Sequence, residues 1–179
     1  MNQRIAVFML FTLNALPTFA ANLTVNFLQP EKFTDAVYNS SFPNASQRNA
    51  SERNIVQQDI EAHLQKLAAQ NLPADYVLKI DVLDIDLAGR VEPLAFPMQP
   101  DLRIVHDIAW PRMKLRYTLQ NGEQVVKSGE EKVSDMNFMF THNRYWNSDR
   151  LRYEKAMLDN WFKKNLAIDG RIIESKKEN

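Results

Sequence analysis

The chain has 179 residues, of which 22 are basic and 22 acidic, so its formal net charge is zero. A balanced charge argues against a nucleic-acid-binding protein, whose surface usually carries a basic excess. Cysteine is absent, which excludes disulfides, thiolate chemistry and a lipid anchor attached through a cysteine. With 45% hydrophobic and 25% charged residues, the composition is typical of one globular domain with its own core.

The first twenty residues have the pattern of a secretory signal peptide. Arg4 is their single charged residue, and the apolar run from Ile5 to Leu13 follows it. The tripeptide Thr18-Phe19-Ala20 places small residues at −3 and −1, which predicts cleavage after Ala20. A membrane anchor is the alternative, and the absence of basic residues on the far side of the run argues against it.

An exported chain without cysteine fits the bacterial periplasm better than a eukaryotic exterior, where disulfides commonly stabilise small domains. We expect no integral membrane span once the signal peptide is removed. The predicted organisation is a signal peptide at 1–20, a single domain at 21–170 and a charged tail at 171–179.

Hydrophobic periodicity predicts a strand, a loop and a helix at the start of the mature chain. Residues Leu23 to Leu28 alternate apolar and polar, and Pro30 ends the predicted strand. Residues 34–51 are rich in Asn, Ser, Thr and Pro, which is typical of a loop. A helix capped by Ser51 is predicted next, since apolar residues recur at helical spacing: Val56, Ile60, Leu64 and Leu67.

The stretch Tyr76–Gly89 is the longest alternating run, and it predicts the central strand. Its apolar positions change from even to odd numbers between Val82 and Leu83. A β-bulge at this point would restore the alternation and turn three acidic side chains outward to solvent: Asp81, Asp84 and Asp86. The strand could also end here. The alternative is that the three aspartates form a buried acidic site.

Later strands follow a segment, 90–101, that three prolines interrupt. A strand resumes with Leu102, Ile104 and Ile108, and clean alternation over 113–119 predicts the next one. Asn121-Gly122 is a strong hairpin signal, so residues 123–131 should return antiparallel to that strand.

A second helix is predicted at 149–166, capped by Asn147 or Ser148, with four residues facing the sheet: Leu151, Leu158, Trp161 and Phe162. The predicted fold class is α+β, a mostly antiparallel four- or five-stranded sheet with two helices on one face. The other face should be wet, because it would carry mainly polar residues: Lys79, Asp81, Lys114, Arg116 and Thr118.

Signatures of several enzyme classes are absent from the sequence. The histidines lie far apart without a His-Glu-x-x-His element, and His63 is expected to be a solvated side chain. No Gly-x-Ser-x-Gly elbow and no phosphate-binding glycine loop occurs. We therefore assign no catalytic residue and no cofactor, and we favour a non-enzymatic protein.

The aromatic loop, residues 138–146, is the main candidate binding site, because loops on a rigid scaffold commonly carry binding residues. The proline-bearing segment 94–100 is a second candidate. The proposed contacts are Phe140, His142, Arg144, Tyr145, Trp146 and Phe96. The competing interpretation is that the aromatic residues seal the core.

The acidic group Asp81, Asp84 and Asp86 is the alternative site. Together with His142 it would suit a hydrolase or a metal-dependent enzyme. The same aspartates can instead form ion pairs across strands with three basic residues: Arg90, Arg103 and Arg112.

Several motifs along the mature chain are shared with a known family. They are Val25-Asn26-Phe27, Pro30 to Asp35, Asp84 to Gly89, Pro111-Arg112-Met113, Leu115-x-Tyr117-x-Leu119, Gly129-Glu130, Ser134 to Phe138 and Leu151 to Lys155. With these motifs the chain resembles the proteobacterial secreted family known as domain of unknown function 3016. The resemblance implies a small exported bacterial protein, and it supplies no activity and no catalytic residue.

The expected function is therefore a periplasmic or secreted module that binds an envelope protein or a peptide. We expect no nucleic-acid partner. The chain should be a monomer or a weak homodimer, the latter formed through an exposed sheet edge.

Overall fold

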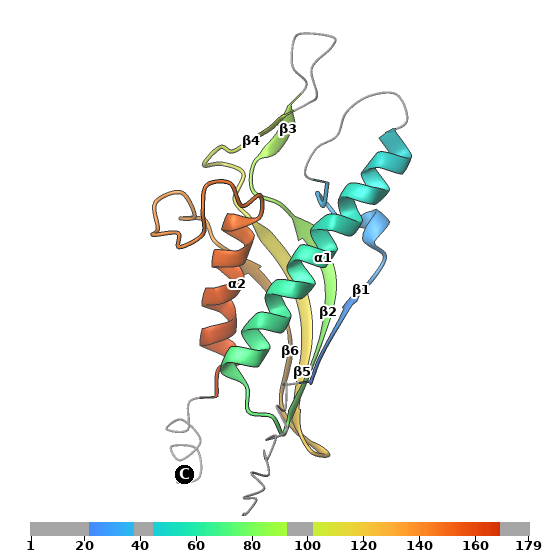
Figure 1. Cartoon of the computed structure of the whole chain (residues 1–179), viewed down its shortest axis with the longest axis vertical. Helices are drawn as coiled ribbons and strands as arrows, with labels where there is room; N and C mark the ends of the chain where they lie inside the picture. The colour runs from blue at the N-terminus through green and yellow to red at the C-terminus, as the bar shows by residue number, and fades with distance from the viewer. Residues whose placement is uncertain (1–21, 38–44, 93–101, 169–179) are drawn as a thin grey trace, which may run out of the picture.

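One long sheet and the two helices that cover it make up most of the molecule (Figure 1). A computed structural model describes residues 22–37, 45–92 and 102–168. In chain order the elements are β1 (Asn22–Phe27), the 3-10 helix η1 (Pro30–Lys32), α1 (Ala45–Asn71), β2 (Tyr76–Asp86), β3 (Arg90–Glu92), β4 (Leu102–Ile104), β5 (Arg112–Asn121), β6 (Gln124–Ser134) and α2 (Arg152–Asn165). The predicted α+β class is confirmed.

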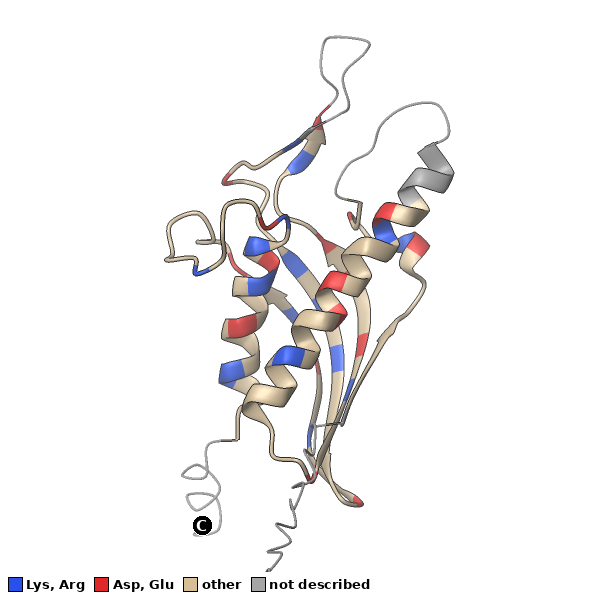
Figure 2. Ribbon diagram, viewed as in Figure 1, with Lys and Arg blue, Asp and Glu red and all other residues tan. Residues whose placement is uncertain are grey.

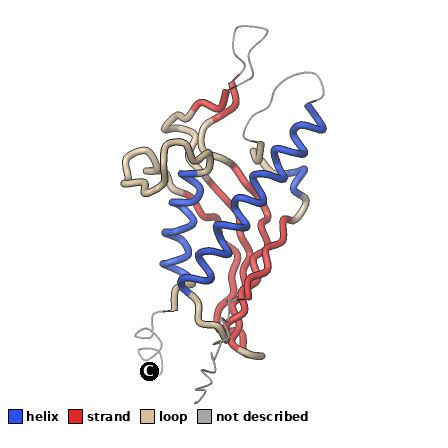
Figure 3. Tube along the Cα trace, in the orientation of Figure 1, coloured by secondary structure: helices blue, strands red, loops and turns tan. Residues whose placement is uncertain are grey.

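The main sheet has four strands in the order β1-β2-β5-β6. β1 pairs with β2 in parallel, with α1 as the crossover, whereas β2, β5 and β6 are antiparallel. The predicted hairpin at Asn121-Gly122 joins β5 to β6, and Gly122 has the positive φ of 57° that this turn favours. β3 and β4 form a separate two-stranded arm at the end of the molecule opposite that turn (Figures 1 and 3).

The predicted β-bulge is present in the central strand. The register between β2 and β5 shifts between Val82 and Asp84, which leaves Leu83 as the extra residue. Val82 and Ile85 are both fully buried as a result, although their numbers differ in parity. The bulge therefore keeps both halves of β2 in contact with the same core.

Both helices lie on one face of the sheet (Figure 1). Their apolar stripes are buried as predicted, with Val56, Ile60, Leu64 and Leu67 from α1 and Leu151, Leu158, Trp161 and Phe162 from the region of α2. Burying a side chain of this size stabilises the fold by about 1.5–3 kcal/mol relative to exposing it. The core between helices and sheet is thus the main source of stability.

The opposite sheet face is polar, as expected. Lys79, Lys114 and Arg116 are exposed there, and Asp81 and Thr118 are half-buried. Charges of both signs are spread over the helices and strands (Figure 2). No helix in the three described ranges combines the length and the apolar content that crossing a bilayer requires.

Several predicted boundaries are wrong. α1 begins at Ala45, inside the stretch predicted as a loop, because a helix held by its apolar stripe extends through Ser and Asn at a cost of only ~0.7 kcal/mol per residue. β4 ends at Ile104, and Ile108 is 80% exposed in the following turn. α2 begins at Arg152, and the side chain of its N-cap residue, Leu151, forms no capping hydrogen bond.

Candidate functional site

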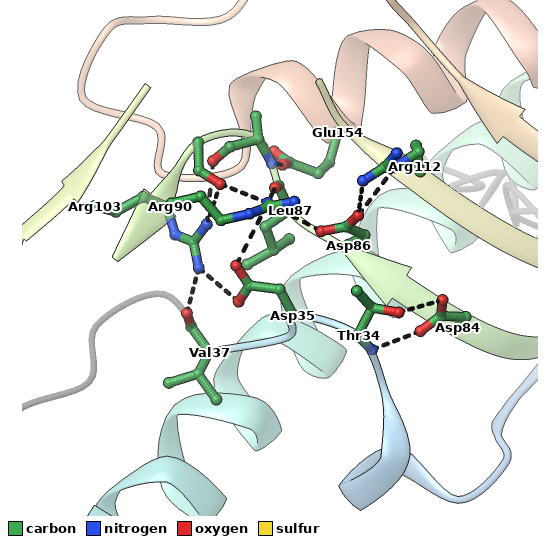
Figure 4. A network of polar contacts seen from close by, with 12 residues as sticks. Thr34, Asp35, Val37, Asp84, Asp86, Leu87, Arg90, Arg103, Arg112 and Glu154 are labelled. Carbon is green, nitrogen blue, oxygen red and sulfur yellow. Dashed lines mark hydrogen bonds and ion pairs between the residues drawn. The ribbon is translucent and has the colours of Figure 1, made fainter. Parts of the chain in front are cut away.

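The three aspartates of β2 have separate partners. Asp81 accepts a hydrogen bond of 2.8 Å from the Asn26 side chain in β1. Asp84 accepts two hydrogen bonds from Thr34, at 2.7 Å from its backbone N–H and 2.8 Å from its hydroxyl (Figure 4). The sequence predicted that both side chains turn outward into solvent. Asp81 and Asp84 are instead half-buried, and each is held by a partner.

Asp86 contradicts the prediction most clearly, because it is only 3% exposed. Nε and Nη2 of Arg112, directly opposite on β5, both donate to Oδ2 of Asp86, and Nη1 of Arg90 forms an ion pair with Oδ1 at 3.1 Å. A buried carboxylate is stable only with such partners. The predicted pairing with Arg90 and Arg112 is therefore confirmed for Asp86, but at a buried position.

Arg103, the third predicted partner, pairs elsewhere. Its guanidinium binds Asp35 at 2.7 Å and donates hydrogen bonds to the carbonyls of Val37 at 2.6 Å and of Ala88 and Gly89 at 3.2 Å each (Figure 4). The arginine therefore joins β4 to the end of β2 and to the segment after η1.

Gly89 makes this junction possible. Its φ is +78°, and a Cβ at this position would collide with the Ile104 carbonyl of β4. The backbone of β4 can lie against the end of β2 only because residue 89 has no side chain.

Glu154 of α2 completes the cluster. It is 2% exposed, and its Oε1 accepts a hydrogen bond of 2.7 Å from the Ala88 N–H. Its Oε2 has no hydrogen-bond partner within the described part of the chain. Burial raises the pKa of Glu154 to about 7, although the Ala88 hydrogen bond acts in the opposite direction.

These side chains form one polar group, buried at Asp86, Arg103 and Glu154 and partly exposed at its other members. We call it the arm-base network: Asp35, Asp86, Arg90, Arg103, Arg112 and Glu154. Its acids and arginines come from six different segments, and their charges largely compensate one another. No three His, Asp or Glu side chains in residues 22–37, 45–92 and 102–168 lie close enough together to hold a metal ion. The network therefore has the features of a structural junction between the arm and the sheet.

The aromatic loop has a different character. Phe140 is 81% exposed and Trp146 is 84% exposed, while Phe138 is buried against Tyr153 of α2. His142 is also exposed. The loop therefore both seals the core, through Phe138, and presents aromatic surface to solvent.

Hydrogen bonds fix the second half of this loop to α2. The Asn143 side chain donates to the Arg152 carbonyl at 3.0 Å and accepts from the Tyr145 N–H at 2.9 Å. The Asp149 N–H donates to the Trp146 carbonyl at 3.0 Å. The loop is thus attached to α2 through Asn143, and a turn between Trp146 and Asp149 holds the segment that follows Trp146.

Asp159 anchors the same region from the interior. Its carboxylate accepts a hydrogen bond of 2.8 Å from the Tyr145 hydroxyl, lies 3.0 Å from His63 Nε2 and pairs with Arg144 at 2.6 Å. Burial alone would raise the pKa of Asp159, but hydrogen bonds from His63 and Tyr145 and the charge of Arg144 hold it below its usual value. Burial beside this carboxylate raises the pKa of Tyr145 to about 12.

His63 is therefore not the solvated side chain that the sequence predicted. It is buried and stands edge-on to the Tyr145 ring, with centroids 5.6 Å apart. Its position three residues after Ile60 and four before Leu67 was the available signal, because it shares the buried side of α1.

Glu154 offered a similar signal, since it lies three residues after Leu151 and four before Leu158. Asp35 and Asp159 carry no comparable pattern, because their partners are remote in sequence.

Two shallow hollows lie beside Trp146, of about 520 and 370 Å³. Arg144, Tyr145 and Trp146 line both, Arg152 lines the larger, and Lys66 lines the smaller. Of the predicted binding residues, the structure thus brings Arg144, Tyr145 and Trp146 together. Phe140 and His142 lie in the same loop but outside these hollows, and Phe96 falls outside the described residues.

The sequence model of a protein family of unknown function, DUF3016, matches residues 21–164. The chain belongs to this family. The DUF3016 match runs from the residue before β1 to the penultimate residue of α2, so both the arm-base network and the aromatic loop lie within it. Searches of curated proteins and of solved structures found no match.

Proposed function

We propose that the protein is an exported binding module that holds a peptide or protein partner of the cell envelope at its aromatic loop. The observation that carries this proposal is the exposure of Phe140 and Trp146 on a loop that is hydrogen-bonded to a rigid helix. Large aromatic side chains dominate the energetics of protein interfaces, and a fixed backbone reduces the entropy lost on binding.

The charges around Trp146 support a polar rim. Arg144 and Arg152 lie beside it, and Lys66 borders the second hollow. An aromatic centre with arginines at its edge is the composition that binding surfaces favour. The three aspartates of β2, in contrast, have separate partners: Asn26 for Asp81, Thr34 for Asp84, and Arg90 and Arg112 for Asp86. We therefore do not propose the enzymatic alternative.

Site-specific photocrosslinking in the periplasm tests the proposed surface. A benzoylphenylalanine residue at position 140 or 146 is expected to yield crosslinked partners. The matched control is position 108, where Ile108 is similarly exposed but lies in the turn after β4. Equal crosslinking at all three positions, or none at 140 and 146, would contradict the proposal.

Export is tested separately. Residues 1–20 fused to alkaline phosphatase, which is active only outside the cytoplasm, should give active enzyme. Replacing Leu10 with Arg in the apolar run should abolish that activity. Activity that is absent from the unmodified fusion would rule out the periplasmic assignment.

A further inference from the structure

β6 is an edge strand, and one of its two sides pairs with no other strand among the described residues. It has 11 residues, and within the described residues its only strand partner is β5. An exposed edge of this length is a ready template for another strand, and most proteins shorten or cover such edges. The backbone direction of β6, the side chains beside it and its charges indicate which kind of strand could pair with it.

The direction of its backbone groups follows from one hydrogen bond. The Asp135 N–H donates to the Pro111 carbonyl at 3.3 Å, so 111 and 135 form a hydrogen-bonded pair. In an antiparallel ladder such pairs alternate, which directs the N–H and C=O of odd-numbered β6 residues toward β5. Even-numbered residues therefore direct theirs outward: Ser128, Glu130, Lys132 and Ser134.

A hollow of about 400 Å³ lies along the same edge, between β6 and α2. Met157 and Trp161 of α2 contribute apolar surface to it, and Val133 does so from β6. α2 packs beside β6 (Figure 1). Residues of both elements line the hollow, so it has a strand on one side and a helix on the other. This combination offers backbone pairing together with a place for a side chain.

Two lysines at this edge have no counter-ion among the described residues. Lys164 lines the hollow, whereas Lys132 alternates with the inward-facing Val133 and directs its side chain to the polar face of the sheet, opposite Lys114. The carboxylate of Glu131 already accepts hydrogen bonds from the Tyr117 hydroxyl at 2.8 Å and from Trp161 Nε1 at 2.9 Å. Asp135 is likewise engaged, by the Asn137 N–H at 3.0 Å.

We propose that an extended acidic segment of a partner protein pairs with β6 as a fifth strand of the main sheet. Its backbone meets the outward groups of Lys132 and Ser134, and one side chain enters the hollow. Carboxylates on its two faces lie near Lys132 on the polar side of the sheet and near Lys164 on the helix side. Lysine on an edge strand often serves only to prevent pairing with another strand. Such protection would not require a hollow beside the strand. The inference rests on the proposed binding function, but it concerns a surface separate from Trp146.

The probe is a library of random twelve-residue peptides displayed on phage and selected on the mature protein. Selected peptides should be rich in Asp and Glu, and in NMR spectra they should shift the amide signals of residues 128–135 and 157–165. Lys132→Pro removes one outward N–H and, because that group faces away from β5, leaves the ladder intact. We expect it to weaken peptide binding about tenfold or more, the equivalent of ~1.4 kcal/mol.

Lys132→Thr is the matched control, because it removes the charge and keeps the N–H, and it should weaken binding less than Lys132→Pro. Ser134→Pro makes the same test if Lys132→Pro does not fold. Substituting Phe140 and Trp146 together should leave binding at β6 unchanged, which separates this inference from the proposed function.

Selected peptides that are not acidic, or that shift signals only around residues 140–146, would overturn the proposal. A concentration-dependent dimer that Lys132→Pro dissociates would also overturn it, since the edge would then belong to a second copy of the chain.

Discussion

The arm-base network and the aromatic loop both depend on side chains from distant segments. They differ in which of their side chains have partners within the molecule. In the network, arginines pair with Asp35 and Asp86, although Oδ1 of Asp86 and Oε2 of Glu154 have no hydrogen-bond partner among the described residues. In the loop, polar groups fix the backbone while Phe140 and Trp146 stay exposed. Buried charges that have partners indicate a structural role, and exposed aromatic side chains on a fixed backbone indicate a binding surface.

The largest effect is expected from breaking the network. Arg103→Ala removes the nearest ion-pair partner of Asp35 and the donor to the Val37 and Ala88 carbonyls, whereas the Gly89 carbonyl keeps a hydrogen bond from Arg90 at 2.8 Å. Removing one partner of a buried ion pair typically costs about 3–5 kcal/mol of unfolding free energy. Urea denaturation should show this loss, and amide hydrogen exchange should accelerate in β3 and β4. A loss below ~1 kcal/mol would show that the junction does not hold the arm.

A somewhat smaller effect is expected at Gly89. Gly89→Ala forces an alanine into positive φ and against the Ile104 carbonyl, at a cost of roughly 3 kcal/mol. Gly122→Ala is the control, because its φ is also positive but nothing lies within 4 Å of the added methyl. Thermal unfolding should rank the two variants in this order. Equal destabilisation would mean that the close approach of β4 is unimportant.

Glu154 should give the fold a pH dependence. Its pKa is raised to about 7 in the folded state, so the folded protein binds more protons than the unfolded chain between pH 4.5 and 7. This group therefore lowers the unfolding free energy as pH rises, by about 2 kcal/mol between pH 5.5 and 8. Glu154→Gln keeps an oxygen for the Ala88 N–H and should flatten this slope in urea titrations. An unchanged slope would assign the pH dependence to another group.

The smallest effect on stability is expected in the aromatic loop. The double variant Phe140→Ser, Trp146→Ser alters exposed side chains and should change the unfolding free energy by less than about 0.5 kcal/mol. Partner crosslinking from position 136, where Met136 is exposed nearby, should nevertheless be lost. A strongly destabilised variant would instead show that these aromatics serve the fold.

Local patterns in the sequence were sufficient for most of the fold. The change of parity at Val82 and Leu83 predicted the bulge, and Asn121-Gly122 predicted the hairpin. Both features depend on neighbouring residues, so they can be inferred without knowing the tertiary contacts.

The candidate sites depended on contacts that the sequence does not reveal. Burial of Asp86 requires arginines from two other strands, and the arrangement around Asp159 requires His63 from α1. The exposure of Trp146 could not be distinguished from the burial of Phe138, because both are aromatic residues of one loop. Such distinctions arise only when remote segments meet.

The central claim is that the aromatic loop is covered by a partner in the envelope. Hydroxyl-radical footprinting of Trp146, in cells and in the purified protein, tests it most directly, with the buried Trp161 as an internal reference. The account predicts rapid oxidation of Trp146 in the purified protein and marked protection in cells, with Trp161 protected in both. Equally rapid oxidation of Trp146 in cells would contradict it.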